Sequence, residues 1–528
     1  MRDFHLPGRS PIYADNAVCA TSHPAAVEVA LDVLKRGGNA VDGAIAGAVA
    51  LGLGEPAMTG LGGDMFALVK PAGSEAIEGL NGSGRAPMGV SAVALRDRGW
   101  RAMDPEDANS VVVPGAVAGF AALAERHGTL GLADCLAPAI RLAEEGVRVV
   151  PRAAYDWARA EPRMRGAMRR FYLSDDRPPQ PGDRFRHEGQ ATVLRAIAER
   201  GAAGFYEGEV AEDLVESLRA LGASHTLEDF AATRADWVDP ISAPYRDAEI
   251  VELPPNTHGA TALLMARILA QFDLSGIDPE GAERAHLEVA AAKLAYAVRD
   301  EASADPGAMT HDVAALAGDA LAGRLAGMID PANAGRVPAS LLGGAPHKDT
   351  VYITVVDRDR MAVSLIYSVY HDFGACLASE RFGINFNNRA AGFSLASGHP
   401  NEIGPGKRPL HTIIPGMLRR GGRVVMPFGV MGGGYQPHGH VRLVSNVVDY
   451  GLDPQAAQDM ARVFHDEGVT WVERGYAQPV VDALSAKSHD VRPRDVPLGG
   501  SQAIWIDHER GCLVGGSDPR KDGLAHGY

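Results

Sequence analysis

The sequence is short of cysteine and of positive charge. Its four cysteines, Cys19, Cys135, Cys376 and Cys512, show no CxxC spacing, which disfavours a zinc site or a disulfide framework and indicates isolated buried thiols. Lys and Arg number 51 against 66 Asp and Glu, which gives a net charge of −15. Because nucleic-acid binding requires a basic footprint, we expect no nucleic-acid partner.

Long apolar runs are also missing. The most apolar stretch, residues 44–53, is rich in Gly and Ala and only about half as long as a membrane span. Residues 1–26 lack the apolar run of a signal peptide, since Pro7, Pro11 and Asp15 interrupt them. We therefore expect a soluble, cytoplasmic protein with no membrane partner.

The composition that remains is typical of a large globular protein, because 528 residues, 46% of them hydrophobic, are ample for a core. Apolar periodicity predicts helices, and β-branched or aromatic runs predict strands. The predicted helices span residues 24–35, 42–53, 117–124, 136–142, 195–222, 283–327 and 439–450. The predicted strands span residues 350–356, 361–370, 423–428, 503–506 and 512–515. Strands that share a chain with helices on both sides of residue 349 indicate a layered α/β architecture.

Thr350 opens the first predicted strand, where a threonine is usually an ordinary strand residue. A threonine hydroxyl is a poor nucleophile until a base takes its proton. If the peptide bond between Asp349 and Thr350 were cut, the new α-amine, with an ordinary pKa of about 7.7–8.0, would be such a base. One residue would then be both nucleophile and base, and its hydroxyl would make the cut by attacking the Asp349 carbonyl.

Three glycine-rich segments are candidate binding loops. Residues 428–437 contain a run of glycines, and two consecutive N–H groups at a helix start would form an oxyanion hole. An ordinary turn or a nucleotide loop is the alternative, although no GxxxxGK[ST] pattern supports a P-loop. Residues 59–66 form a weaker glycine-rich turn. Residues 81–87 place Arg85 among small residues, where it is suited to a carboxylate or simply exposed to solvent.

Together these segments resemble the gamma-glutamyltransferase family of N-terminal-nucleophile (Ntn) hydrolases over essentially the full chain. Six ordered motifs carry the resemblance, at residues 37–66, 113–120, 349–359, 404–415, 429–437 and 517–528. The resemblance implies an α/β (α+β) fold, a four-layer αββα sandwich. It also implies that a large chain, residues 1–349, and a small chain, residues 350–528, form this sandwich jointly as one intertwined domain.

The resemblance also implies a catalytic site. It assigns the cleavage site to Asp349 and Thr350, the nucleophile to Thr350, and the oxyanion-hole glycines to Gly432 and Gly433. Ser368 stands where the family has a threonine that hydrogen-bonds the nucleophile. No metal and no organic cofactor are implied. The implied partners are a small-molecule amide substrate and the two chains of one precursor, and a homo-oligomer of the processed heterodimer stays open.

Some positions depart from the pattern with which the family holds a γ-glutamyl group. The carboxylate-binding Arg of the family is displaced by two residues to Arg85. The Asp that holds the substrate amine aligns with Gly392, and the Asn and Gln that assist it become Tyr370 and Arg389.

The paired serines of the family become His411 and Thr412. Losing an Asp while gaining Arg389 disfavours a bound ammonium group, which would face like charge, and favours a substrate with a carboxylate and no amine. This pattern resembles the oxamate amidohydrolase branch of the family. The candidate substrate-binding residues are therefore Arg85, Tyr370, Arg389, His411 and Thr412. A packed structural histidine at His411 and a surface arginine at Arg389 are the alternatives.

The expected function is self-processing followed by hydrolysis of a small, oxamate-like amide through an acyl-Thr350 intermediate. The enzyme alternatives are a glutathione hydrolase or gamma-glutamyl transpeptidase and a cephalosporin-type (glutaryl) acylase. Outside enzymes, the alternative is an uncut binding paralogue.

Overall fold

Local sequence signals account for the first two helices of the structure, a computed structural model that describes residues 5, 8–335 and 350–528. Helix α1 (Pro24–Lys35) begins with proline, whose missing N–H is not needed in the first turn, and is followed by Gly37 at φ 99°. Helix α2 (Ala40–Gly54) starts at a capping box between Asn39 and Asp42. Every residue of α2 is buried, so this helix lies inside a layer of the fold.

Two antiparallel sheets of seven strands each form the centre of the molecule. The β10 sheet runs in the order β19 (Leu524–Gly527), β2 (Val18–Thr21), β10 (Val351–Val356), β11 (Ala362–Ser368), β3 (Asp64–Lys70), β4 (Glu78–Gly82) and β7 (Asp236–Val238). The β13 sheet runs in the order β1 (Ile12–Ala14), β18 (Cys512–Ser517), β17 (Gly500–Asp507), β13 (Arg423–Met431), β12 (Gly416–Arg420), β9 (Ala248–Glu252) and β8 (Ile241–Tyr245).

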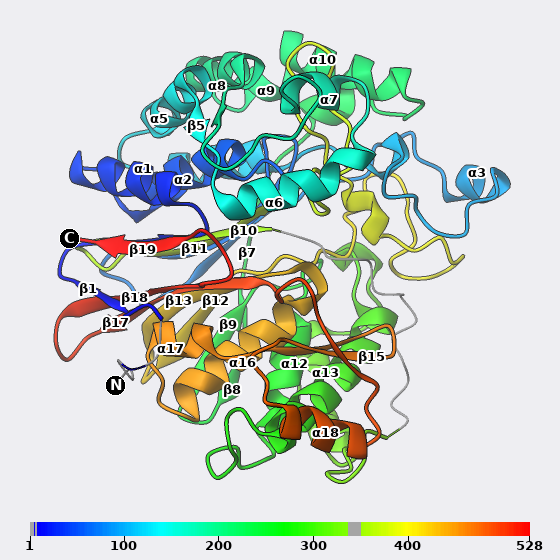
Figure 1. Ribbon diagram of the computed structural model, residues 1–528. Coiled ribbons are helices and arrows are strands. Elements are labelled where there is room, and N and C mark those ends of the chain that lie inside the picture. Colours follow the sequence, from blue (N-terminus) through cyan, green and yellow to red (C-terminus); the bar gives the residue numbers. More distant parts are fainter. Residues whose placement is uncertain (1–4, 6–7, 336–349) are drawn as a thin grey trace.

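Helices cover the outer face of each sheet, and the two sheets face each other between them (Figure 1). On the side of the β10 sheet lie α1, α2, α4 (Ala116–His127), α5 (Leu132–Glu145), α6 (Pro151–Ala160), α7 (Ala167–Tyr172), α8 (Glu188–Arg200), α9 (Ala203–Tyr206) and α10 (Glu209–Ala220). On the side of the β13 sheet lie α12 (Gly259–Leu269), α13 (Ala282–Ala302), α15 (Asp319–Ala326), α16 (Gln436–Val448), α17 (Pro454–Asp459) and α18 (Gln478–Ala486). This arrangement confirms the predicted four-layer αββα sandwich.

Smaller elements complete the chain. They are α3 (Ala92–Asp97), α11 (Leu227–Ala231), α14 (Val313–Leu316), the three-stranded sheet β14 (Val463–Asp466), β15 (Val469–Val472) and β16 (Val491–Pro493), and the pair β5 (Val147–Arg148) and β6 (Arg184–Phe185). No helix in the described part of the chain combines the length and the apolar character needed to span a membrane.

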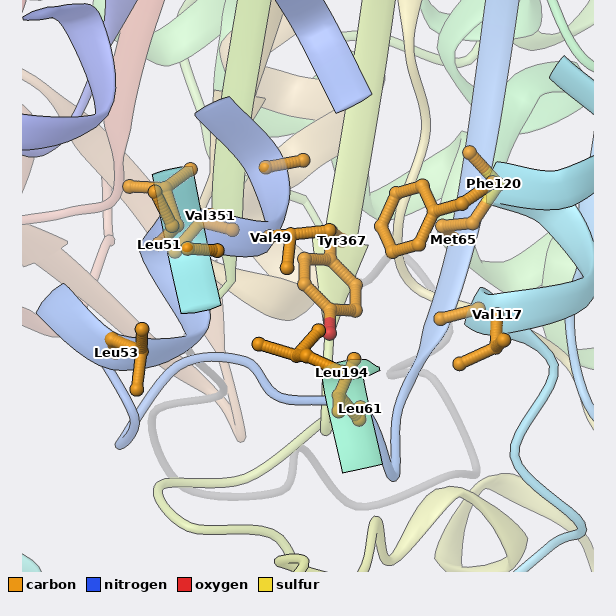
Figure 2. Close-up of a cluster of buried hydrophobic side chains, with 14 of the residues drawn as sticks. Val49, Leu51, Leu53, Leu61, Met65, Val117, Phe120, Leu194, Val351 and Tyr367 are labelled. Carbon is orange, nitrogen blue, oxygen red and sulfur yellow. The ribbon is translucent and has the colours of Figure 1, made fainter. Parts of the chain in front are cut away.

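Strand β3 shows where the core lies. Its side chains alternate, so Phe66 and Leu68 belong to the cluster between the sheets, while Met65 and Val69 belong to the cluster beneath the helices. Figure 2 shows the second cluster, in which Met65 lies close to Tyr367 of the neighbouring strand. Burying each such side chain contributes about 1.5–3 kcal/mol, so β3 is held from both faces.

The predicted elements are largely present, with two corrections. The predicted helix at 195–222 is divided among α8, α9 and α10, because Gly201 and Gly208 adopt φ 62° and φ 70° between them. The predicted helix at 283–327 is divided among α13, α14 and α15. Strands before residue 349 are missing from the prediction. β3 is buried on both faces and therefore lacks the alternation that identifies a strand.

Both sheets take strands from each side of residue 349. In the β10 sheet, β10 pairs with β2 and with β11, and β11 pairs in turn with β3. In the β13 sheet, β12 pairs with β9, and β18 pairs with β1. The backbone hydrogen bonds of the sandwich therefore join the two parts of the chain throughout.

Candidate active site

Thr350 immediately precedes β10 and is 1% exposed. The β10–β11 hairpin pairs Val351 with Tyr367 and so brings Thr350 beside Ser368, the last residue of β11. Thr350 Oγ1 donates a hydrogen bond to Ser368 Oγ at 3.5 Å and accepts one from Gln436 Nε2 at 3.4 Å. The threonine hydroxyl is thus held between two polar side chains from different elements.

The backbone after Ser368 makes an unusual turn. Tyr370 adopts φ 88°, a region that residues with a side chain rarely enter and that is often found at functional sites. Its N–H donates to Ser368 Oγ at 2.8 Å. The turn therefore follows the end of the strand, and its N–H orients the Ser368 hydroxyl.

The glycine turn between β13 and α16 lies next to Thr350, because Gln436 follows this turn and contacts Thr350. Gly432 and Gly433 adopt φ 117° and φ 56°, and a Cβ on Gly432 would lie 2.8 Å from the Cα of Gly499. Only glycine fits this position. Within residues 5, 8–335 and 350–528, no backbone carbonyl accepts a hydrogen bond from the N–H of Gly432 or Gly433.

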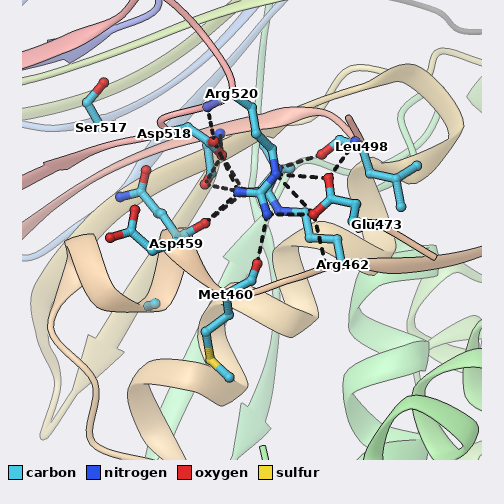
Figure 3. A network of polar contacts seen from close by, with 12 residues as sticks. Asp459, Met460, Arg462, Glu473, Leu498, Ser517, Asp518 and Arg520 are labelled. Carbon is cyan, nitrogen blue, oxygen red and sulfur yellow. Dashed lines mark hydrogen bonds and ion pairs between the residues drawn. The ribbon is translucent and has the colours of Figure 1, made fainter. Parts of the chain in front are cut away.

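A network of buried and partly buried polar side chains contacts Leu498, the residue before Gly499 (Figure 3). Arg462 donates to the carbonyl of Leu498 at 2.6 Å, and Leu498 N–H donates to Glu473 at 2.8 Å. Arg462 also pairs with Asp518, and Arg520 pairs with Glu473. Since Leu498 precedes the glycine that packs against Gly432, the network determines where the turn can lie.

Arg389 forms a second part of the site. It is fully buried in the short helix η4 (Arg389–Gly392), which excludes the alternative of a surface arginine. Its guanidinium lies 4.2 Å from the ring centroid of Tyr370, and Nη1 donates to Thr412 Oγ1 at 3.3 Å. Nε is 3.5 Å from Asp64 Oδ2, an ion pair without hydrogen-bond geometry. Among the described residues, Nε and Nη2 of Arg389 have no hydrogen-bond partner.

Asp64 is the centre of this buried cluster. Its carboxylate accepts from Gly84 N–H at 2.7 Å, from Gly115 N–H at 3.3 Å and from His411 Nε2 at 3.1 Å. Asp64 is also directly opposite Ser368 in the pairing of β3 with β11, which joins the Arg389 cluster to the Thr350 group. Asp64 is not among the site residues predicted from the sequence. The sequence signal that could have identified Asp64 is its position between the pair Gly62-Gly63 and an apolar strand.

Burial sets the protonation of the two basic groups. It lowers the pKa of Arg389 to about 10, against the opposing charge of Asp64, so the guanidinium stays charged at neutral pH. Burial, and after it the charge of Arg389, lowers the pKa of His411 to about 3. His411 is therefore neutral and donates Nε2–H to Asp64, which corresponds to the alternative of a structurally bonded histidine.

Arg85 lies in a different set of contacts. Its half-exposed side chain donates to the carbonyl of Gly406 at 3.0 Å and pairs with Asp236 at 3.4 Å and with Asp305 at 3.8 Å. The structure thus brings Tyr370, Arg389, His411 and Thr412 together and directs the Arg85 side chain toward acidic partners. Asp349, the other half of the predicted cleavage site, lies outside the described residues.

The chain is similar to proteins of one known family. A model of the gamma-glutamyltranspeptidase family matches residues 26–528. The glutathione hydrolase-like YwrD proenzyme of Bacillus subtilis is 34% identical over 511 residues, which cover 94% of this chain and 95% of that protein. The oxamate amidohydrolase proenzyme of Klebsiella pneumoniae is 33% identical over 532 residues, which cover 97% and 98%. The solved structure of a cephalosporin acylase from Bacillus halodurans has a TM-score of 0.93 at 37% identity and covers 100% of this chain and 99% of that one.

Proposed function

Because the chain belongs to the gamma-glutamyltranspeptidase family of Ntn hydrolases, and is thus an enzyme, we propose that it is a self-processing amidohydrolase for a small, carboxylate-bearing amide. It cuts the bond between Asp349 and Thr350 and then acts through an ester on Thr350. The observation that carries this proposal is the arrangement of the Thr350 hydroxyl between Ser368 and Gln436, beside the turn of Gly432.

Processing comes first in the proposed sequence. Thr350 Oγ1 attacks the carbonyl carbon of Asp349, the C–N bond breaks, and the nitrogen takes a proton to become the free α-amine. The resulting ester joins Asp349 to the Thr350 side chain. Water then opens this ester, which restores the hydroxyl and leaves Asp349 with a carboxylate.

Turnover uses the new α-amine as the base. The amine takes the Oγ1 proton, Oγ1 attacks the substrate carbonyl, and the amine passes the proton to the departing nitrogen. The N–H groups of Gly432 and Gly433 stabilise the oxyanion, and each such donor is typically worth about 3 kcal/mol. Water, deprotonated by the same amine, then opens the acyl-Thr350 ester and releases the acid.

Arg389 supports a carboxylate-bearing substrate. A charged guanidinium with two donors lacking partners in the described chain is suited to a carboxylate, which forms strong, charge-assisted bonds with a planar fork of N–H groups. Asp64 already accepts three N–H donors and therefore offers little to a substrate ammonium. Tyr370 and Thr412 hold the guanidinium in place.

These features favour an oxamate-like amide, and a relative named as an oxamate amidohydrolase is 33% identical to the chain. Two other substrate classes stand as alternatives, because a relative is named as glutathione hydrolase-like and a similar structure is titled as a cephalosporin acylase. Both alternatives use the same acyl-threonine chemistry, so they differ only in the pocket around Arg389.

Replacing Thr350 by alanine tests the nucleophile. We expect Thr350→Ala to stay a single full-length band on a denaturing gel and to be inactive, because both self-cleavage and substrate hydrolysis start with attack by the Thr350 hydroxyl. Thr354→Ala is the matched control, since Thr354 lies in β10 and is also buried but donates to the Val363 carbonyl. The control should be cut and active. A Thr350→Ala protein that still splits into two chains would refute the proposal.

A hydrolysis screen tests the substrate class. We expect oxamate to be cleaved with a higher kcat/KM than glutathione or a glutaryl amide. Preference for glutathione would overturn the assignment of Arg389 without affecting that of Thr350. Cytoplasmic location and a homo-oligomer of the processed heterodimer also stay predictions, which cell fractionation and light scattering would check.

A further inference from the structure

Gln436 is a buried polar residue that contacts the proposed nucleophile and has no role in the chemistry described so far. It is the first residue of α16, follows the glycine turn directly and is 0% exposed. Its Nε2 lies 3.4 Å from Thr350 Oγ1, and its Oε1 accepts from Ile414 N–H at 3.0 Å. The side chain therefore spans the space between a backbone donor and the threonine hydroxyl.

The Ile414 contact determines which end of the amide faces Thr350. A backbone N–H can only donate, so the oxygen of the Gln436 amide must face Ile414. The NH2 group then points at Thr350 and can only donate to it. Gln436 thus presents a fixed donor, and not an acceptor, to the nucleophile.

The hydroxyl of Thr350 has one hydrogen and two lone pairs. The hydrogen is directed to Ser368, whose Oγ also receives the Tyr370 N–H, and one lone pair is occupied by Gln436. Among contacts with described residues, one lone pair remains to attack a carbonyl. Gln436 and Ser368 together therefore orient the Thr350 hydroxyl in the structure.

We propose that Gln436 is a catalytic residue that donates a hydrogen bond to Thr350 Oγ1 whenever this oxygen carries negative charge. The assignment rests on the proposed acyl-threonine chemistry. When water opens the acyl ester, the bond between the acyl carbon and Oγ1 breaks, the electron pair stays on Oγ1, and the Thr350 ammonium returns a proton. A donor aimed at Oγ1 stabilises this departing alkoxide, because hydrogen bonds to charged oxygens are stronger than those to neutral ones.

The distance of 3.4 Å is compatible with such a role. Catalytic hydrogen bonds are often long without substrate and shorten in the reacting complex. The position is also well supported, since Tyr296 of α13 donates to the carbonyl of Gly434 in the turn that precedes Gln436. A small closing movement of this turn would bring the amide toward Oγ1.

The test compares Gln436→Glu with Gln436→Met in the processed enzyme. Glu keeps the shape and removes the donor, whereas Met keeps the length and removes all polarity. We expect kcat to fall about 10- to 100-fold in both variants, the effect of losing one hydrogen bond to a charged group, with KM changed less than about threefold. Time-resolved gels should also show slower self-cleavage in both, because processing uses the same oxygen.

The pH profile separates catalysis from packing. A buried Glu becomes protonated as the pH falls, and a protonated Glu can donate again. The ratio of the Gln436→Glu rate to the wild-type rate should therefore rise with falling pH, while the ratio for Gln436→Met stays constant. Gln478→Glu is the matched control, because Gln478 also begins a helix and precedes a proline but is exposed and bonds Asp482. It should keep the wild-type rate.

Wild-type kcat in either Gln436 variant would overturn the assignment. So would equal losses in both variants that do not change with pH, since these would mean that Gln436 only fills space. Either result, combined with an uncut and inactive Thr350→Ala protein, removes the role of Gln436 alone. An active Thr350→Ala protein would instead remove the proposed function itself.

Discussion

Replacing Asp64 by asparagine tests how charge is balanced beneath the proposed carboxylate site. Asp64 is the buried, charged partner of Arg389. It also accepts hydrogen bonds from Gly84, Gly115 and His411, of which the bond from Gly115, at 3.3 Å, is the longest. An asparagine at this position would keep the shape, remove the negative charge and turn an NH2 group toward some of these donors.

The expected cost follows from the buried charge. Removing one partner of a buried ion pair typically costs about 3–5 kcal/mol, because the other charge is left without compensation. Over the 528 residues of the chain, an unfolding entropy of about 2.1 cal/mol/K per residue gives roughly 1.1 kcal/mol per degree. The Asp64→Asn variant should therefore unfold roughly 3–5 °C below the wild type.

The opposite change should cost much less. In Arg389→Met the Asp64 carboxylate keeps its three N–H donors, and the methionine fills a similar volume. We expect a smaller loss of stability than in Asp64→Asn, because hydrogen bonds from N–H groups also stabilise a buried carboxylate. Substrate binding should nevertheless weaken in Arg389→Met, because KM for a carboxylate-bearing substrate rises when its guanidinium partner is gone.

Scanning calorimetry of both variants, with kinetics on the same preparations, measures this asymmetry. Asp490→Asn is the control for loss of a charge, since the pair of Asp490 with Arg492 is exposed and exposed ion pairs contribute little to stability. If Arg389→Met lowers the unfolding temperature as much as Asp64→Asn, the three N–H donors do not stabilise Asp64 by themselves and the reasoning fails.

Two further predictions concern the rest of the molecule. Arg462→Met removes the hydrogen bond to the Leu498 carbonyl, next to the glycine turn, so kcat should fall roughly tenfold while KM stays nearly unchanged. Steady-state kinetics measure both constants, and a variant in which KM rises while kcat is unchanged would contradict this role of Arg462. Burial lowers the pKa of His465 and of His489 to about 3, and His489 is bonded to His286 at 2.8 Å. The unfolded chain, with a His pKa of about 6.5, binds more protons below that pH. The stability of the folded protein should therefore fall as the pH falls from about 6.5 toward 3. In His489→Gln this loss should be less steep, because one of the two histidines is gone. Unfolding temperatures that depend on pH identically in the wild type and in His489→Gln would contradict this prediction.

Features that depend on neighbouring residues follow from the amino-acid order alone. The hairpin of β10 and β11 belongs to this class, because a β-branched run, a short turn and a second β-rich run predict it from neighbouring residues. The two ends of α1 can also be predicted from neighbouring residues, since proline starts a helix and glycine ends one through backbone geometry within a single turn. The glycines after β13 marked a turn of special geometry for the same reason.

The surroundings of Thr350 depend on contacts that no local pattern records. Arg389 and Asp64 are 325 positions apart and meet only because β11 pairs with β3, and the burial of Arg389, which the sequence left open, arises in that packing. Gln436 reaches Thr350 because the two sheets stack face to face. Strand β3 itself escaped prediction, since a strand that is buried on both faces has no alternation to reveal it. Chain order thus marked Thr350 as the candidate nucleophile, and the packing of distant strands decided which charges surround it.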